Sequence, residues 1–157
     1  MWYFQNEVFD PKPEQLDPKK DIGFVYLITN LVDGRKYIGK KLFFSSKTKQ
    51  IKGKKKKTKV ESDWRKYYGS NAAIQEDVQK LGESNFRREI LYLCRSKSEC
   101  SYWETKEIFV RDALLKSNDF YNEWVMCKIR SAHLGSLKNK SSQPGLQSSL
   151  RPDNHES

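Results

Sequence analysis

The feature that most constrains the fold is a pair of short strand-forming runs with a turn signal between them. Residues 23–29 (GFVYLIT) are rich in β-branched and aromatic side chains, and residues 35–41 (RKYIGKK) carry a second, shorter run. Such side chains favour strands. Asp33-Gly34 lies between the runs, and this dipeptide suits a two-residue type I′ turn. The segment therefore predicts an antiparallel hairpin.

Further elements follow the hairpin. Residues 70–82 place apolar side chains at helical spacing and end in glycine, which predicts an amphipathic helix. Residues 86–94 (FRREILYLC) predict a third strand whose second half is buried. Ser96 and Glu99 stand three apart as a capping box, which opens a second helix expected to run to about Leu115.

Length and composition divide the chain into three parts. A chain of 157 residues is long enough for one core rather than two. Prolines follow an aromatic patch near the N-terminus, so residues 1–20 are expected to form an arm packed on the domain, neither a helix nor a central strand. The domain is expected over residues 21–134. Ser, Asn, Gln, Pro and Gly dominate residues 135–157, which predicts a disordered tail.

The positive charge is concentrated in one segment. Residues 40–66 hold twelve basic and two acidic side chains, and twelve minus two equals the formal net charge of +10. Residues 45–60 lack an apolar period and predict a mobile basic loop. A field of this kind attracts polyanions, with nucleic acid or an anionic membrane as the candidates. The side chains expected to bind nucleic acid are Lys40, Lys47, Lys49, Lys52, Lys54, Lys55, Lys56, Lys57, Lys59 and Lys66.

Cysteine and histidine usage argues against two kinds of site. Cys94, Cys100 and Cys127 form no CxxC pair and the chain has two histidines, so neither a zinc site nor a disulfide framework is indicated. The N-terminus is not a basic region leading into an apolar run, and no stretch approaches ~20 apolar residues. We expect an unsecreted, cytoplasmic protein without a membrane segment. Its oligomeric state stays open.

Five sequence elements in order resemble the GIY-YIG nuclease family. Phe24-Val25-Tyr26 and Tyr37-Ile38-Gly39 are similar to the pair of motifs that names the family. The downstream matches are Trp64-Arg65, Glu104 and Tyr121-Asn122. Any one of these would be weak, but five in the family's order make a specific match that covers roughly residues 23–122.

The resemblance implies both a fold and an activity. The fold, which the strand count allows, is α/β with a small three-stranded antiparallel sheet flanked by helices. The activity is that of a metal-dependent endonuclease hydrolysing phosphodiester bonds, in double-stranded DNA rather than RNA, in a phage or bacterial setting. Two alternatives stay open. One is a catalytically silent nucleic-acid-binding protein on the same scaffold, and the other is a basic structural protein whose tyrosines are only core.

The hairpin geometry can be tested without the family. If Asp33 and Gly34 are the two loop residues, Tyr26 faces Lys41 and Tyr37 faces Asn30. Side chains alternate with period two, so both tyrosines then project from one face of the sheet. A loop of three residues would send them to opposite faces.

By resemblance, Tyr26 activates the attacking water and Tyr37 positions the water or the phosphate. A free tyrosine has a pKa near ~10, so a tyrosine base needs a neighbouring cation near neutral pH. Lys36, Lys40 and Lys41 are all close in sequence. Lys41 is assigned to the catalytic set, although the sequence does not decide among the three.

Arg65 is the expected phosphate clamp, since its planar fork can donate two hydrogen bonds to one phosphoryl group. Many family members carry a histidine four positions later, where this chain has Gly69. Tyr67 or Tyr68 could take that place.

Glu104 is the expected metal ligand on the spacing that the resemblance implies, and a single carboxylate with waters suits Mg²⁺ or Mn²⁺. Glu107 is the rival on the next helix face, but Arg111 four residues on can satisfy it as an ordinary ion pair. Asn122 is expected to support the site by hydrogen bonding to its backbone.

Overall fold

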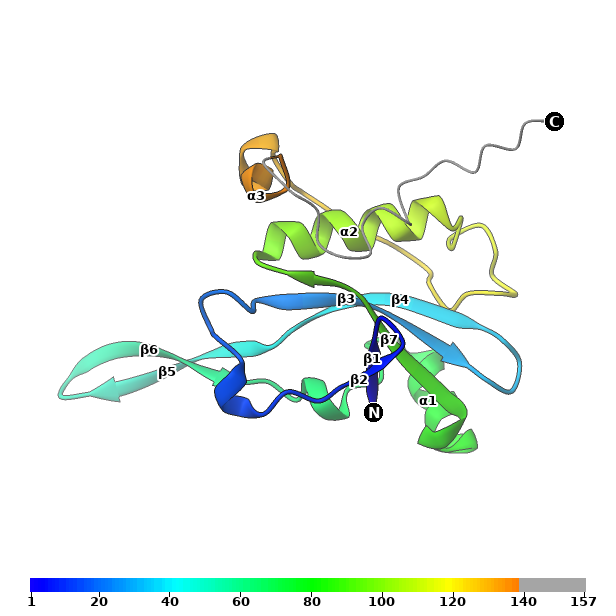
Figure 1. The fold of residues 1–157 in the computed structure, drawn as a ribbon, viewed down its shortest axis with the longest axis horizontal. Coiled ribbons are helices and arrows are strands. Elements are labelled where there is room, and N and C mark those ends of the chain that lie inside the picture. The colour runs from blue at the N-terminus through cyan, green and yellow to red at the C-terminus, as the bar shows by residue number, and fades with distance from the viewer. Residues whose placement is uncertain (139–157) are drawn as a thin grey trace.

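A five-stranded sheet with helices on both faces organises the protein (Figure 1). The computed structural model describes residues 1–138. The strand order is β2-β1-β7-β3-β4, and these strands span β1 Trp2–Phe4, β2 Glu7–Phe9, β3 Gly23–Asn30, β4 Lys36–Leu42 and β7 Phe86–Cys94. A separate two-stranded ribbon consists of β5 Phe44–Ile51 and β6 Lys54–Glu61. The helices are α1 Ala72–Leu81, α2 Lys97–Val110 and α3 Gly135–Lys138.

The α/β class is confirmed, but the sheet has five strands rather than three. The two additional strands come from residues 1–20, which were expected to be only an arm. β1 pairs in parallel with β7 and β2 pairs with β1. Trp2 explains this, because its side chain is buried and its indole N–H donates to the carbonyl of Trp64 at 2.8 Å. The three prolines all follow β2, so they do not interrupt either strand.

The β3–β4 hairpin is present with a different register from the one predicted. Tyr26 pairs with Gly39 and Tyr37 pairs with Ile28. The amide of Asn30 donates to the carbonyl of Arg35, so four residues form the loop rather than two. The two tyrosines still share a face, because two- and four-residue loops have the same parity.

Two hydrophobic clusters cover the two faces of the sheet. One contains Phe24, Tyr26 and Ile28 together with Ile74 of α1. The other contains Val25, Leu27 and Ile38 packed against Trp103 and Ile108 of α2. In Figure 1 α2 lies above the sheet and α1 lies below it. The strand alternation therefore points Tyr26 and Tyr37 away from α2, while Lys40 points toward it.

The basic segment is a β-ribbon, which corrects the prediction of a mobile loop over 45–60. β5 and β6 pair from Phe44↔Glu61 to Ile51↔Lys54, and the ribbon extends away from the body of the protein (Figure 1). Lys49 lies opposite Lys56, and lysines occupy both faces. Because neither face is apolar, the sequence shows no buried strand pattern and resembles a loop.

The remaining predictions concern the helices and the tail. Asn71 caps α1 and Ser96 caps α2, but α2 ends at Val110 rather than near Leu115. Of the predicted tail, 135–157, the first four residues form α3, and residues from 139 onward lie outside the described part. No helix within residues 1–138 is long and apolar enough to cross a membrane.

Candidate active site

The two motif tyrosines line a pocket of about 260 Å³ at the edge strand β4. Tyr26 is almost completely buried, with 1% of its surface exposed, and its ring centroid lies 6.1 Å from that of Tyr37. Gly39 pairs directly with Tyr26. A Cβ at position 39 would collide with the Tyr26 hydroxyl. The glycine of the second motif therefore leaves the space that the phenol occupies.

Lys40 and Glu104 enter the same pocket from the α2 side. Lys40 Nζ lies 3.4 Å from Glu104 Oε2 and 2.8 Å from the hydroxyl of Ser101. Glu104 has 18% of its side chain exposed, so its carboxylate is partly desolvated but still reachable. The pocket thus combines two phenols, one ammonium and one carboxylate.

Burial sets the protonation of these groups. It raises the pKa of Tyr26 well above its usual range, and the neighbouring Tyr67 raises it further. The pKa of Tyr37 is also raised, mainly by burial and in part opposed by its hydrogen bond to Ser70. Burial raises the pKa of Glu104, and Lys40 opposes that rise. A tyrosine base here would need additional positive charge before it could ionise near neutral pH.

Residues around Tyr37 fix its position. The Tyr37 hydroxyl and the Ser70 hydroxyl are 3.0 Å apart. Gly69 has a φ of +94° and packs against the Tyr37 ring, where a Cβ would lie 3.2 Å from two ring carbons. A histidine at this position would be strained and crowded. Gly69 therefore supports Tyr37 sterically.

Asn122 holds the backbone of β4. Its Oδ1 accepts from the amide of Ile38 at 3.0 Å, and its Nδ2 donates to the carbonyl of Ile38 at 2.8 Å. These are the backbone hydrogen bonds expected of Asn122, and they lie between Tyr37 and Gly39 on the strand that lines the pocket.

Comparison with known proteins decides the family. The family profile described as "Putative endonuclease segE, GIY-YIG domain" matches residues 2–125. The chain belongs to the GIY-YIG family. The match begins at Trp2, in agreement with the inclusion of the N-terminal residues in the sheet.

The similar proteins are phage proteins. The chain is 36% identical over 99 residues to "Putative endonuclease segE" and 30% identical over 98 residues to "Putative endonuclease segD", both from Enterobacteria phage T4. The matches cover 63% and 62% of this chain but only 39% and 35% of the relatives. The chain therefore spans well under half the length of these relatives. No solved structure matches it significantly.

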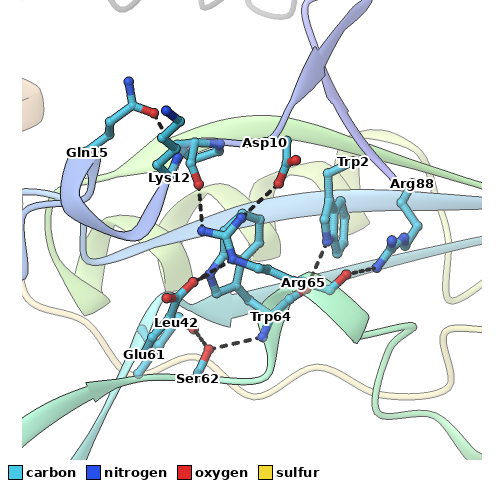
Figure 2. Close-up of polar contacts among 11 residues, drawn as sticks. Trp2, Asp10, Lys12, Gln15, Leu42, Glu61, Ser62, Trp64, Arg65 and Arg88 are labelled. Carbon is cyan, nitrogen blue, oxygen red and sulfur yellow. Dashed lines mark hydrogen bonds and ion pairs between the residues drawn. The ribbon is translucent and has the colours of Figure 1, made fainter.

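Arg65, the predicted phosphate clamp, is held by internal partners in this GIY-YIG domain. Its Nε donates to Glu61 at 2.7 Å, one terminal nitrogen donates to Asp10 at 2.8 Å, and the other donates to the carbonyl of Pro11 at 2.6 Å (Figure 2). Its guanidinium also stacks on the Trp64 ring. Arg65 is not among the residues lining the tyrosine pocket. In this structure Arg65 ties the N-terminal segment to residues 61–65, and its role as phosphate clamp stays a prediction.

Lys41, which was predicted to be catalytic, is likewise not among the residues that line the tyrosine pocket, and its catalytic role stays a prediction. Its ammonium is 2.6 Å from Asp63 and 4.0 Å from the centroid of the Tyr67 ring. The Tyr67 ring in turn packs edge-on against Tyr26 at 5.9 Å. The four-residue loop shifts the register of the hairpin by two residues from the one predicted, so Gly39 rather than Lys41 pairs with Tyr26. Lys36 contacts the carbonyl of Gly34 instead, so Lys40 is the candidate cation in the pocket.

Glu107 forms the predicted ion pair but is buried rather than solvated. Its Oε2 accepts from Arg111 Nε at 2.8 Å, and its Oε1 accepts from the Tyr92 hydroxyl at 2.5 Å. Only 8% of its side chain is exposed. Both carboxylate oxygens are therefore occupied by internal partners.

Several pocket residues were missed by the sequence reasoning. Ser70 and residues 123–126 also line the pocket. Trp124 and Met126 are largely exposed there, at 71% and 75%. No local pattern distinguishes them, because residues 123–130 form neither helix nor strand. The one signal in the sequence is that they follow Asn122 directly.

The residues of the pocket fit a magnesium ion better than a metal ion that needs three or more protein ligands. Within residues 1–138, no three His, Cys, Asp or Glu side chains gather closely enough to hold a metal. Mg²⁺ is often held by one or two carboxylates and several waters. Glu104, lining a surface pocket beside two phenols, matches that mode.

Proposed function

We propose that this GIY-YIG domain is a metal-dependent endonuclease that hydrolyses phosphodiester bonds in double-stranded DNA. The observation that carries the proposal is the convergence of Tyr26, Tyr37, Lys40 and Glu104 on one pocket. Phosphodiester hydrolysis needs a base for water, positive charge near phosphorus and stabilisation of the leaving oxygen. Lys40 offers the positive charge, and Tyr26 offers a base once added positive charge lowers its pKa.

Each pocket residue has a role in the proposal. Tyr26, after releasing its own proton to solvent, accepts the proton of the attacking water as a phenolate, and Tyr37 orients the water or the phosphate through a hydroxyl anchored by Ser70. Lys40, which lines the same pocket, stabilises the negative charge that develops on phosphorus. Glu104 holds Mg²⁺, or Mn²⁺, which when bound supplies Lewis acidity to the phosphoryl oxygens.

The β5–β6 ribbon supports duplex DNA as the substrate. It presents Lys47, Lys49, Lys54 and Lys56 on one face and Lys55, Lys57 and Lys59 on the other. A two-stranded ribbon has the dimensions to enter the major groove of B-DNA. Lysine contacts to phosphate contribute affinity without sequence information. Lys66 is exposed beyond the end of the ribbon and is expected to add one more such contact.

A catalytically silent DNA-binding protein is the second candidate. Two observations favour it: Arg65 is engaged by Glu61 and Asp10 away from the pocket, and the pKa of Tyr26 is raised rather than lowered. Both candidates bind DNA, so only cleavage separates them.

The deciding experiment is incubation of supercoiled plasmid with purified protein across a Mg²⁺ titration. We expect relaxed and linear products with the wild type in Mg²⁺, and none in EDTA. Glu104→Gln should lose the Mg²⁺-dependent cutting while retaining DNA binding, because the amide keeps the shape but not the charge. Glu76→Gln, which alters a surface ion pair of α1 with Lys80, is the matched control. Folded wild type that binds but never cuts would support the silent alternative.

A further inference from the structure

A second, larger hollow of about 690 Å³ lies between β4, the base of the ribbon and the start of α2. Four lysines and four serines line it, and within the described part of the chain no acidic residue does. Its remaining lining includes Ile22, Leu42 and Phe44. We call this hollow the basic groove. A hollow lined by both apolar and basic side chains fits a ligand that carries both phosphates and less polar parts.

The basic groove adjoins the tyrosine pocket. Lys40 lines both, and its ammonium contacts Ser101 in the groove and Glu104 in the pocket. At its other side the groove reaches Ser45, Ser46 and Lys59 at the base of the ribbon. It therefore connects the reacting groups with the ribbon.

The charges in the groove are not equally compensated. Lys40 is paired with Glu104 and Lys41 with Asp63. Lys59 is exposed, and its ammonium lies 3.4 Å from a neutral partner, the carbonyl of Pro18. Lys97 is exposed at the first turn of α2, where the helix dipole adds to the positive potential. Lys59 and Lys97 are thus the side chains best placed to receive phosphate.

We propose that the basic groove binds the phosphates of the DNA strand that flank the phosphate in the tyrosine pocket, with Lys59 and Lys97 as the contacting residues. This inference rests on the proposed function. The groove has the volume for more than a lone phosphate ion, and it leads from the pocket to the ribbon. A strand that follows it would be held on one side of the cut, and the reacting phosphate would be aligned as a consequence.

The test measures which lysines DNA protects. Tyr26→Phe protein, which should bind without cutting, is acetylated with and without saturating duplex DNA, and each lysine is quantified by mass spectrometry. We expect Lys59 and Lys97 to be protected about as strongly as Lys54 to Lys57 at the ribbon tip. Lys116, which is exposed beyond the far end of α2, serves as the unprotected control.

Each outcome has one meaning. If DNA protects the lysines of the ribbon tip but not Lys59 and Lys97, the proposal that the basic groove binds DNA is wrong, while the nuclease proposal is unaffected. If DNA protects Lys59 and Lys97 but the wild-type protein never cuts plasmid, the groove binds DNA and the nuclease proposal is wrong. A parallel arm with inorganic pyrophosphate separates the sources of phosphate. Protection of the groove by pyrophosphate but not by DNA would overturn the proposal in favour of a small-anion site.

A matched pair of variants adds a quantitative readout. Lys59→Ala with Lys97→Ala should lower the salt dependence of duplex binding by a slope of roughly 1.8, about 0.9 for each phosphate left without its lysine partner. Lys19→Ala with Lys116→Ala removes the same charge from exposed positions outside the groove and should leave the slope unchanged. Equal slopes for the two double variants would contradict the groove.

Discussion

Two polar clusters in this domain both contain residues that match the family's motifs, but they differ in how their partners are arranged. Around Arg65, three nitrogens of the guanidinium are taken by Glu61, Asp10 and the carbonyl of Pro11. Around Tyr26, polar groups line a surface pocket, and burial disfavours ionisation of both the phenol and the nearby Glu104. The first cluster is closed by internal hydrogen bonds, and the second leaves room for a ligand.

The difference separates structural polar residues from candidate catalytic ones. A cluster that satisfies its own charges stabilises the fold and has nothing left to offer a substrate. A cluster whose groups have strongly shifted pKa values and line a pocket is typical of functional sites. On this basis we predict a structural role for Arg65 and catalytic roles for Tyr26 and Glu104.

The largest effect that we expect from this difference between the two clusters is the loss of cleavage in Tyr26→Phe. The change removes one hydroxyl from the pocket and should lower cleavage by roughly 100-fold or more, the usual scale for loss of a general base. The melting temperature should shift by no more than about 4 °C, because the ring and its packing are kept. Cleavage rate and thermal melt are measured on the same preparation. A fully active Tyr26→Phe would remove this residue from the mechanism.

Arg65→Ala should have the opposite profile. It breaks the hydrogen bonds to Glu61 and Asp10, and we expect a loss of roughly 1–3 kcal/mol in the free energy of unfolding, the scale of charge-assisted hydrogen bonds. Cleavage per folded molecule should stay within about threefold of the wild type, because Arg65 does not line the pocket. Urea unfolding and a cleavage assay well below the melting temperature give the two numbers. A stable but inactive Arg65→Ala would return the arginine to the active site.

The smallest expected effect is the pH dependence of stability in Glu104→Gln. The folded protein holds the pKa of Glu104 above its usual value. The Glu104 carboxyl group therefore contributes to the stability of the folded protein below its usual pKa. This contribution is lost as the pH rises through the higher pKa that the group has in the folded state. Glu104→Gln should melt at or above the wild-type temperature at neutral pH, and this advantage should shrink as the pH falls.

Glu107→Gln is the contrast for Glu104→Gln. It weakens a buried carboxylate that accepts from Tyr92 and Arg111, so it should melt below the wild type at neutral pH. Melting curves of both variants between acidic and neutral pH make the comparison. If Glu104→Gln melts at a lower temperature than Glu107→Gln at neutral pH, then Glu107 rather than Glu104 is the carboxylate whose ionisation destabilises the fold.

Local sequence signals predicted the hairpin, both main helices and the third strand, because each depends on periodicity and capping that a single sequence contains. The pairing of β1 with β7 was not predictable in this way, since it depends on Trp2 reaching the carbonyl of Trp64, 62 positions away. The ribbon was missed because strands with two solvated faces carry no hydrophobic alternation.

Only some of the pocket residues could be predicted from the sequence, because the others depend on tertiary contacts. Tyr26, Tyr37, Glu104 and Asn122 were named from motif order, and the structure brings all four to one pocket. Arg65 was also named from motif order and Lys41 from its proximity to the tyrosines in sequence, but neither lines the pocket, because Arg65 pairs with Glu61 and Lys41 with Asp63. Which of several nearby cations reaches a pocket is a tertiary property.

The four-residue loop between β3 and β4 has a consequence for how this domain can change over evolution. Removing or adding two residues among 31–34 would keep Tyr26 and Tyr37 on one face, while a change of one residue would turn one of them toward α2. Length variation in this turn should thus be tolerated in even steps and selected against in odd ones. A surface loop that touches none of the reacting groups would then be as sensitive to single-residue indels as the pocket is to substitution.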